Sequence, residues 1–191
     1  EGRQLLITGK GRCNITNDAP ISQFIKHVYP NGRFLRTAFS SFFSKDIIEL
    51  LKEHGVESTL ERGGRYFPAS NRSSDVLRAL LHWVNSYKVD IRCGHRVEEL
   101  IVEDNIIKGV KANGQRFMCN HVIMATGGKS YPATGSNGEG YELARLAGHS
   151  IVKARPALVP LETEGDLAQK LQGLNLKNVK ATVWVNGRKK A

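Results

Sequence analysis

The chain has 191 residues, of which 40% are hydrophobic, and 28 Lys and Arg against 18 Asp and Glu give it a net charge of +10. This length fits one globular domain, or one domain with part of a second. No apolar run approaches the roughly 20 residues that span a bilayer, and no secretory signal opens the chain. We therefore expect a cytoplasmic protein with no membrane partner.

Composition also bears on metals and nucleic acids. The three cysteines are widely spaced and the histidines do not cluster, so we expect neither a disulfide scaffold nor a metal site. The basic residues are scattered and no aromatic residues alternate with them, so we expect no nucleic-acid partner. A basic nucleic-acid-binding protein remains the less favoured alternative, and steeply salt-dependent binding would reveal it.

The first notable element is a glycine loop at residues 9–14, after the apolar residues 5–7. Glycines let backbone N–H groups approach a phosphate or a ring, so Gly9, Lys10, Gly11 and Asn14 are candidate ligand contacts. Arg12 would supply a fixed positive charge, or else form a surface ion pair. Cys13 is a candidate contact that reads either as a redox thiol or, preferably, as a small packing residue.

Helical patterns follow at residues 21–29, 34–43 and 44–55, with Ser44 as the expected N-cap and Gly55 as the end. A short strand at 56–60 leads to a turn in which Arg62 and Arg65 could hold an anionic substrate or form structural ion pairs. A helix is predicted at 74–87, where the apolar residues recur at helical spacing. His27 and His54 read as solvated histidines.

The spacing of the apolar residues then changes from the helical period to the period of strands. Residues 89–93, 97–103, 106–112 and 115–119 predict a β-meander, with Asn113-Gly114 as a hairpin turn. A buried strand is predicted at 121–126, and Ala125, Thr126, Gly127 and Gly128 end it in a turn that either suits a nucleotide ligand or is simply a tight turn after a central strand.

A helix is predicted at 140–147, and Gly138 and Gly140 would present backbone N–H groups at its start. Residues 151–160 read as a connector bracketed by Pro156 and Pro160. Residues 161–191 predict strands around a short helix. We therefore divide the chain into a domain at 1–155 and the beginning of a second, β-rich domain at 156–191.

Several of these motifs resemble one known family, the BaiN/RdsA family of NAD(P)/FAD-dependent oxidoreductases, some of whose members are named aminoacetone-oxidase-like flavoproteins. The matching segments are residues 5–17, 61–68, 125–132, 135–141 and 156–161. The resemblance implies an α/β fold: a partial Rossmann-like FAD-binding domain of the two-dinucleotide-binding type with a β-meander, followed by the start of a β-rich domain.

The resemblance also implies FAD as cofactor, NAD(P)H as a candidate donor and an unidentified small-molecule substrate. Val97 resembles the position whose backbone meets the adenine ring, and the alternative is an ordinary strand valine. The implied cofactor-binding residues are Gly9, Lys10, Gly11, Arg12, Cys13, Asn14, Val97, Ala125, Thr126, Gly127, Gly128, Gly138 and Gly140. Catalytic residues and the oligomeric state stay open.

Family members open with a β-α-β unit carrying G-x-G-x-x-G and extend well past residue 191. We therefore expect this chain to be an internal segment of an FAD-dependent enzyme that by itself binds FAD weakly or not at all. The alternative is a truncated, non-catalytic module without bound flavin. The yellow colour of oxidised FAD would distinguish the two.

Overall fold

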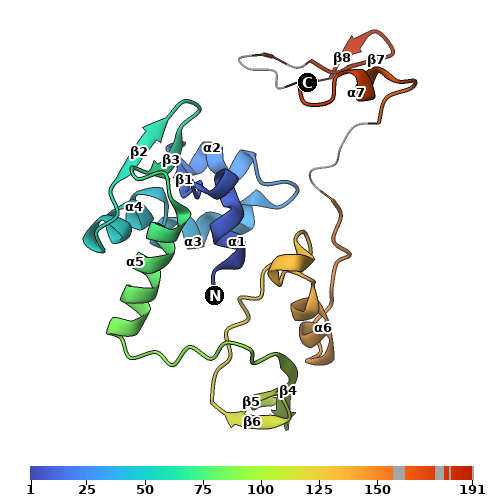
Figure 1. Ribbon diagram of the computed structural model, residues 1–191. Coiled ribbons are helices and arrows are strands. Elements are labelled where there is room, and N and C mark those ends of the chain that lie inside the picture. Colours follow the sequence, from blue (N-terminus) through green and yellow to red (C-terminus); the bar gives the residue numbers. More distant parts are fainter. Residues whose placement is uncertain (157–161, 175–178, 181, 191) are drawn as a thin grey trace. The chain divides into compact units, whose positions relative to one another are not determined.

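The computed structural model describes residues 1–156, 162–174, 179–180 and 182–190 (Figure 1). By packing, the chain divides into two compact units, Glu1–Lys153 and Ala154–Ala191, which we describe separately. The predicted boundary between a flavin-binding domain and a second domain, at residues 155 and 156, stays a prediction.

Short helices and two small antiparallel sheets build the first unit (Figure 1). The helical elements are α1 (Arg3–Ile7), η1 (Thr8–Gly11), α2 (Ile21–Lys26), η2 (Gly32–Leu35), α3 (Arg36–Ser41), α4 (Ser44–Glu53), α5 (Ser73–Ser86), η3 (Pro132–Thr134) and α6 (Glu139–Leu146). The apolar residues 5–7 lie in α1, so a helix precedes the first glycine loop.

The first sheet has the order β1 (Thr16–Asn17), β3 (Arg65–Pro68), β2 (Ser58–Glu61), with all pairs antiparallel. β2 begins two residues later than predicted because the Val56 N–H donates to the Leu51 carbonyl at 2.8 Å and completes the end of α4. Beside this sheet lies the hydrophobic core, formed by Cys13, Leu51, Val56, Val76 and Ala79.

The prediction that Ser44 caps α4 is wrong. Phe43 occupies the cap position, and the Asp46 carboxylate accepts the Phe43 N–H at 2.5 Å. The Ser44 hydroxyl is buried and donates to the Asn17 carbonyl at 2.8 Å. A long-range partner has therefore replaced the local capping bond, and it ties α4 to β1.

The second sheet is the predicted meander, in the order β4 (Val97–Glu103), β5 (Ile106–Ala112), β6 (Gln115–Met118). The strand predicted at residues 89–93 is absent. Asp90 and Arg92 instead pair with each other at 2.7 Å, and Val89 and Ile91 are exposed. An alternating apolar pattern forms a strand only where another backbone can pair with it.

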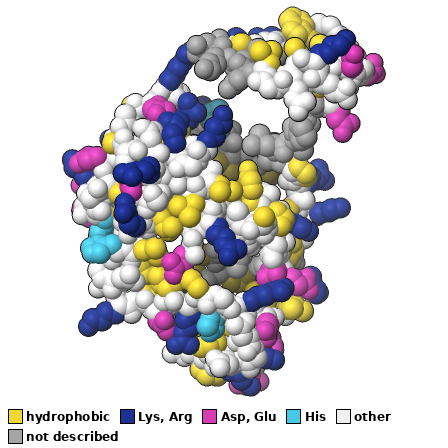
Figure 2. All heavy atoms as spheres, viewed as in Figure 1, with side chains coloured by type: hydrophobic (Ala, Val, Ile, Leu, Met, Phe, Trp, Pro, Cys, Tyr) yellow, Lys and Arg dark blue, Asp and Glu magenta, His cyan; other side chains and the backbone are white. Residues whose placement is uncertain are grey.

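The buried strand predicted at residues 121–126 is also absent. The segment carries no strand, and Ile123 is 91% exposed. A central strand needs neighbours on both sides to satisfy its backbone groups, and no strand among the described residues pairs with this segment. Exposed hydrophobic side chains are widespread on the face drawn in Figure 2.

The second unit contains α7 (Leu167–Lys170) and a hairpin of β7 (Trp184–Val185) and β8 (Arg188–Lys189). The hairpin turns at residues 186–187, as the sequence predicts. Pro160 and Ala181, which figure in the predicted connector and last strand, lie outside the described residues. Across the described part of both units, no helix has the length and apolarity to cross a membrane.

Candidate functional site

The first glycine turn, residues 9–14, is a tight backbone structure. Gly9, Lys10, Gly11 and Cys13 all have positive φ, between 57° and 84°. A Cβ on Gly9 would lie 2.9 Å from the Asn14 nitrogen, so this glycine is required by the protein's own packing. A Cβ on Gly11 would meet nothing closer than 4.0 Å, so the space beside Gly11 is open to a ligand.

Arg12 is held by the protein. Its guanidinium forms an ion pair with Glu61 at 2.8 Å, donates to the Asn71 side-chain oxygen at 3.1 Å and lies 3.9 Å over the Phe67 ring. This is the ion-pair interpretation offered by the sequence. The arrangement anchors the first glycine turn to β2 and β3 and leaves Arg12 largely neutralised.

Lys10 differs from Arg12 both in its exposure and in its ion pairing. Its side chain is exposed, and within the described part of the chain it enters no ion pair. Among the two cations of the first glycine turn, Lys10 is thus the one whose charge is available to an anionic ligand.

Cys13 belongs to the core. It is 5% exposed and packs with Leu51 and Val76. Burial raises the pKa of the Cys13 thiol, and a hydrogen bond with Thr8 opposes this only in part. A buried thiol that stays protonated is a poor nucleophile, which favours the packing interpretation.

The second glycine turn, residues 125–128, meets the start of α6. A Cβ on Gly140 would lie 2.0 Å from the Thr126 hydroxyl oxygen, so the two backbones touch there. Gly127 is exposed with φ +74°, and Gly128 has only the Tyr141 hydroxyl at 3.7 Å from its Cβ position. Ala125 is exposed. The structure therefore brings residues 126–128 together with Gly138 and Gly140.

One hydrogen bond links the glycine-rich run 135–140, which packs beside this second turn, to α1, the helix before the first turn. The buried Ser136 hydroxyl donates to the Gln4 side-chain oxygen in α1 at 2.8 Å. Sequence analysis missed both residues. Ser136 lies within the glycine-rich run 135–140, which was a usable signal, whereas nothing in the sequence singles out Gln4.

Val97 lies at the start of β4, in a cavity of about 290 Å³ that α6 also lines. Arg96 and Glu139 form an ion pair of 2.6 Å across it. Because Glu139 stands between Gly138 and Gly140 in the chain, Val97 lies beside the two glycines that accompany the second glycine turn. Arg65, by contrast, donates from its Nε to the Arg62 carbonyl at 3.2 Å, an internal contact of the β2–β3 turn.

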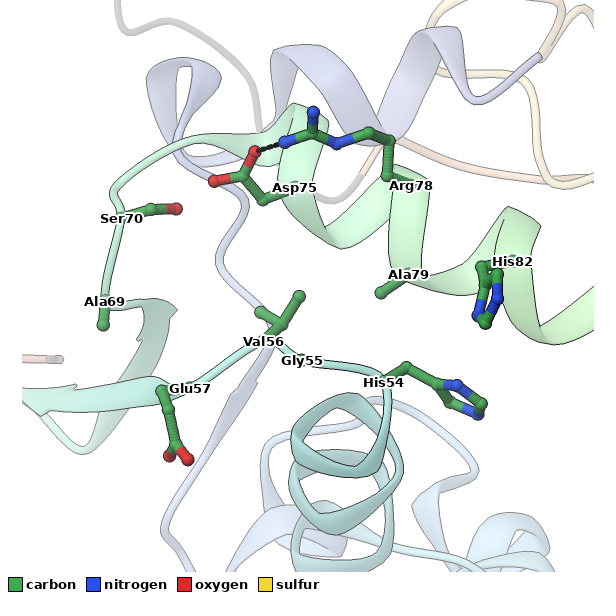
Figure 3. Close-up of a pocket in the computed structure, with 10 residues that line it drawn as sticks. All are labelled: His54, Gly55, Val56, Glu57, Ala69, Ser70, Asp75, Arg78, Ala79 and His82. Carbon is green, nitrogen blue, oxygen red and sulfur yellow. Dashed lines mark hydrogen bonds and ion pairs between the residues drawn. The ribbon is translucent and has the colours of Figure 1, made fainter.

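A separate cavity of about 480 Å³ lies between the end of α4 and α5 (Figure 3). Asp75 and Arg78 pair within it, and bonds from Ser70 and Arg78 hold the pKa of Asp75 below its usual range. His54 and His82 face each other at 6.0 Å between ring centroids, so His54 is not simply a solvated histidine. No group of three metal-ligating side chains gathers among the described residues.

Comparison with known proteins identifies the family. Residues 1–185 match the model described as the HI0933-like protein Rossmann domain. The chain belongs to this family. The predicted relation to the BaiN/RdsA flavoproteins and the α/β class of the Rossmann fold are thereby confirmed.

Curated relatives of this HI0933-like chain include one reductase and two dihydrouridine synthases by name. It is 38% identical over 165 residues to the 3-dehydro-bile acid delta(4,6)-reductase of Clostridium scindens, covering 85% of this chain and 39% of that protein. It is 29% and 28% identical to the ribosomal RNA dihydrouridine synthases of Escherichia coli and Haemophilus influenzae, covering 91% and 92% of this chain and 42% and 44% of theirs. The chain thus spans about two fifths of the length of these relatives.

Proposed function

We propose that this chain is part of an FAD-dependent oxidoreductase in which the two glycine turns contact the flavin nucleotide. Membership of a Rossmann-domain family and similarity to a named reductase support this. The structural observation that carries it is the hydrogen bond from Ser136, which packs beside Gly127 of the second glycine turn, to Gln4 in the helix that leads into the first.

The residues present fit an anionic dinucleotide. Lys10 offers a cation without an ion pair among the described residues, and the space beside Gly11 allows close approach without a side chain in the way. Gly127 is exposed, and the Ser136 hydroxyl oxygen lies 3.2 Å from its Cβ position. FAD, when bound, supplies hydride and electron transfer, so the protein's task is to hold and orient it.

Other candidate residues act indirectly in this proposal. Arg12 positions the first glycine turn through Glu61, and Gly140 makes room for Thr126. The start of α6 suits a phosphate less well, because the Asn137 side chain already accepts the Glu139 N–H at 3.1 Å. Val97 would line the same region from β4.

The relatives' names suggest the substrate class. Dienone steroids and uridine share a ring C=C bond conjugated to a carbonyl, and reduction of such a bond adds a hydride to the β carbon and a proton to the α carbon. We propose that the substrate is an organic molecule of this class and that NAD(P)H supplies the electrons.

Full-length protein tests the proposal. We expect it to purify with bound FAD, to lose the oxidised-flavin absorbance when NADPH or NADH is added anaerobically, and to regain it when a steroid 4-en-3-one or uridine-containing RNA is added. A colourless full-length protein that does not take up added FAD would contradict the proposal and favour the non-catalytic module.

A further inference from the structure

One stretch of the first unit is purely basic. Between Asp18 and Asp46 the sequence contains no acidic residue, while its four Lys and Arg residues include Lys26, Arg33 and Arg36. None of these three enters an ion pair among the residues that the structure describes. The positive charge of these three side chains is therefore not neutralised by an ion pair, and it would attract an anionic partner.

Five of the six Phe and Tyr residues of the same stretch fall into two groups, and the sixth, Phe42, is 49% exposed. Phe24, Phe39 and Phe43 pack together, with ring centroids 4.9–5.3 Å apart. Tyr29 and Phe34 are 93% and 86% exposed, more than any other aromatic side chain among the described residues. The stretch thus packs one set of rings together, each half-buried, and presents the other to solvent.

Backbone packing holds Tyr29 and Phe34 at the surface. Gly32 is buried, and a Cβ there would lie 2.0 Å from the Ile25 carbonyl oxygen. The Phe34 N–H donates to the Asn31 carbonyl at 3.0 Å. Residues 25–35 surround a hollow of about 830 Å³ whose lining includes Tyr29 and Phe34. The two rings therefore stand on an ordered turn that α2 and η2 support.

We propose that this surface, formed by Lys26, Tyr29, Arg33, Phe34 and Arg36, binds single-stranded nucleic acid. Exposed rings offer stacking platforms for unpaired bases, and flanking cations neutralise the phosphates. An acidic peptide would use the cations but leave the two rings without a function. The proposal reverses the expectation from sequence, because the exposure of Tyr29 and Phe34 is decided by folding.

Binding by full-length protein tests it, with a fluorescein-labelled single-stranded RNA of about 12 nucleotides as the probe. We expect Tyr29→Ala/Phe34→Ala to weaken binding about 10- to 100-fold, as loss of two stacking contacts implies. Arg33→Ala/Arg36→Ala should reduce the slope of log affinity against log salt by about two. Trp184→Ala, and Lys153→Ala/Arg155→Ala, are matched controls at exposed positions of other segments and should change neither quantity.

Three outcomes would overturn the proposal. Wild-type protein could fail to bind the RNA at about 50 mM salt. Polyglutamate could bind as tightly as RNA, with no loss in the Tyr29→Ala/Phe34→Ala variant. That variant could instead melt several degrees lower with RNA binding unchanged, which would mean that other polypeptide covers the rings. Because binding is measured without turnover, a failure of the proposed flavin chemistry leaves this test intact.

Discussion

The two glycine turns of the candidate site differ in how completely the described chain builds them. In the first turn, Cys13 lies in the core and Arg12 is anchored by Glu61, so packing within the chain determines its shape. The second turn follows a segment that pairs with no described strand and exposes Ile123. A turn supported by a local core is complete by itself, whereas a turn at a strand end depends on the strand's neighbours.

Truncating one apolar residue in each region tests this contrast most strongly. Leu51 is 1% exposed in the core, so Leu51→Ala should lower the free energy of unfolding by about 2–5 kcal/mol. Ile123→Ala should change it by less than about 0.5 kcal/mol. Urea denaturation compares the two, and an equally large loss for Ile123→Ala would mean that residues 121–126 are packed in solution.

Replacing one glycine of each turn by alanine should give the next largest difference in stability. Gly9→Ala places a Cβ 2.9 Å from the Asn14 nitrogen at φ +57°, so we expect a loss of about 1–3 kcal/mol. Gly128→Ala meets only an ordinary contact, and its melting temperature should equal that of wild type. If Gly128→Ala nevertheless loses FAD in the full-length protein, the ligand itself approaches Gly128.

Arg12 tests the anchoring of the first turn. Because the ion pair with Glu61 is partly exposed, Arg12→Ala should cost only about 1 kcal/mol, including the contact with Phe67. Glu61→Gln should free Arg12 and cost no more than that. Unfolding curves of both variants check this, and a neutral Arg12→Ala would contradict the anchoring role.

Cys13 gives the smallest effect on stability. Its raised pKa means that its contribution to stability is present at neutral pH and is lost as pH rises through and above the ordinary thiol range of about 8.5. Iodoacetamide at pH 8 should modify the exposed Cys119 on the order of tenfold faster than Cys13, as peptide mass spectrometry would detect. Cys13→Ser should leave flavin reduction largely intact, and a loss of turnover with FAD content and fold unchanged would favour a redox thiol.

The elements predicted well from sequence are those that local interactions decide. The Asn113-Gly114 turn fixes the β5–β6 hairpin, and the periodicity of α5 is carried by its own residues. The strand predicted at 121–126 fails because pairing depends on distant backbone. The prediction of a Ser44 cap is wrong because the Ser44 hydroxyl donates instead to a long-range acceptor, the Asn17 carbonyl.

The candidate site divides in the same way. Glycine turns are visible in a sequence because few other residues tolerate positive φ. Their supports are not, because Arg12 meets Glu61 49 residues away and Ser136 meets Gln4 132 residues away. The exposure of Tyr29 and Phe34 was equally hidden, since both resemble ordinary core residues in a helical pattern.

The central claim is that the second glycine turn contacts FAD, and the FAD content of full-length Gly127→Val tests it most directly. Gly187→Val controls for the backbone conformation, because Gly187 has φ +71° against +74° at Gly127 and lies in the β7–β8 hairpin. It does not reproduce the contact with Ser136, whose hydroxyl oxygen is 3.2 Å from the Gly127 Cβ position, whereas no described residue other than its chain neighbours lies within 4 Å of the Gly187 Cβ position. Absorbance and circular dichroism should show that Gly127→Val loses FAD while keeping its secondary structure, and that Gly187→Val keeps both. Full FAD occupancy in Gly127→Val would contradict the claim.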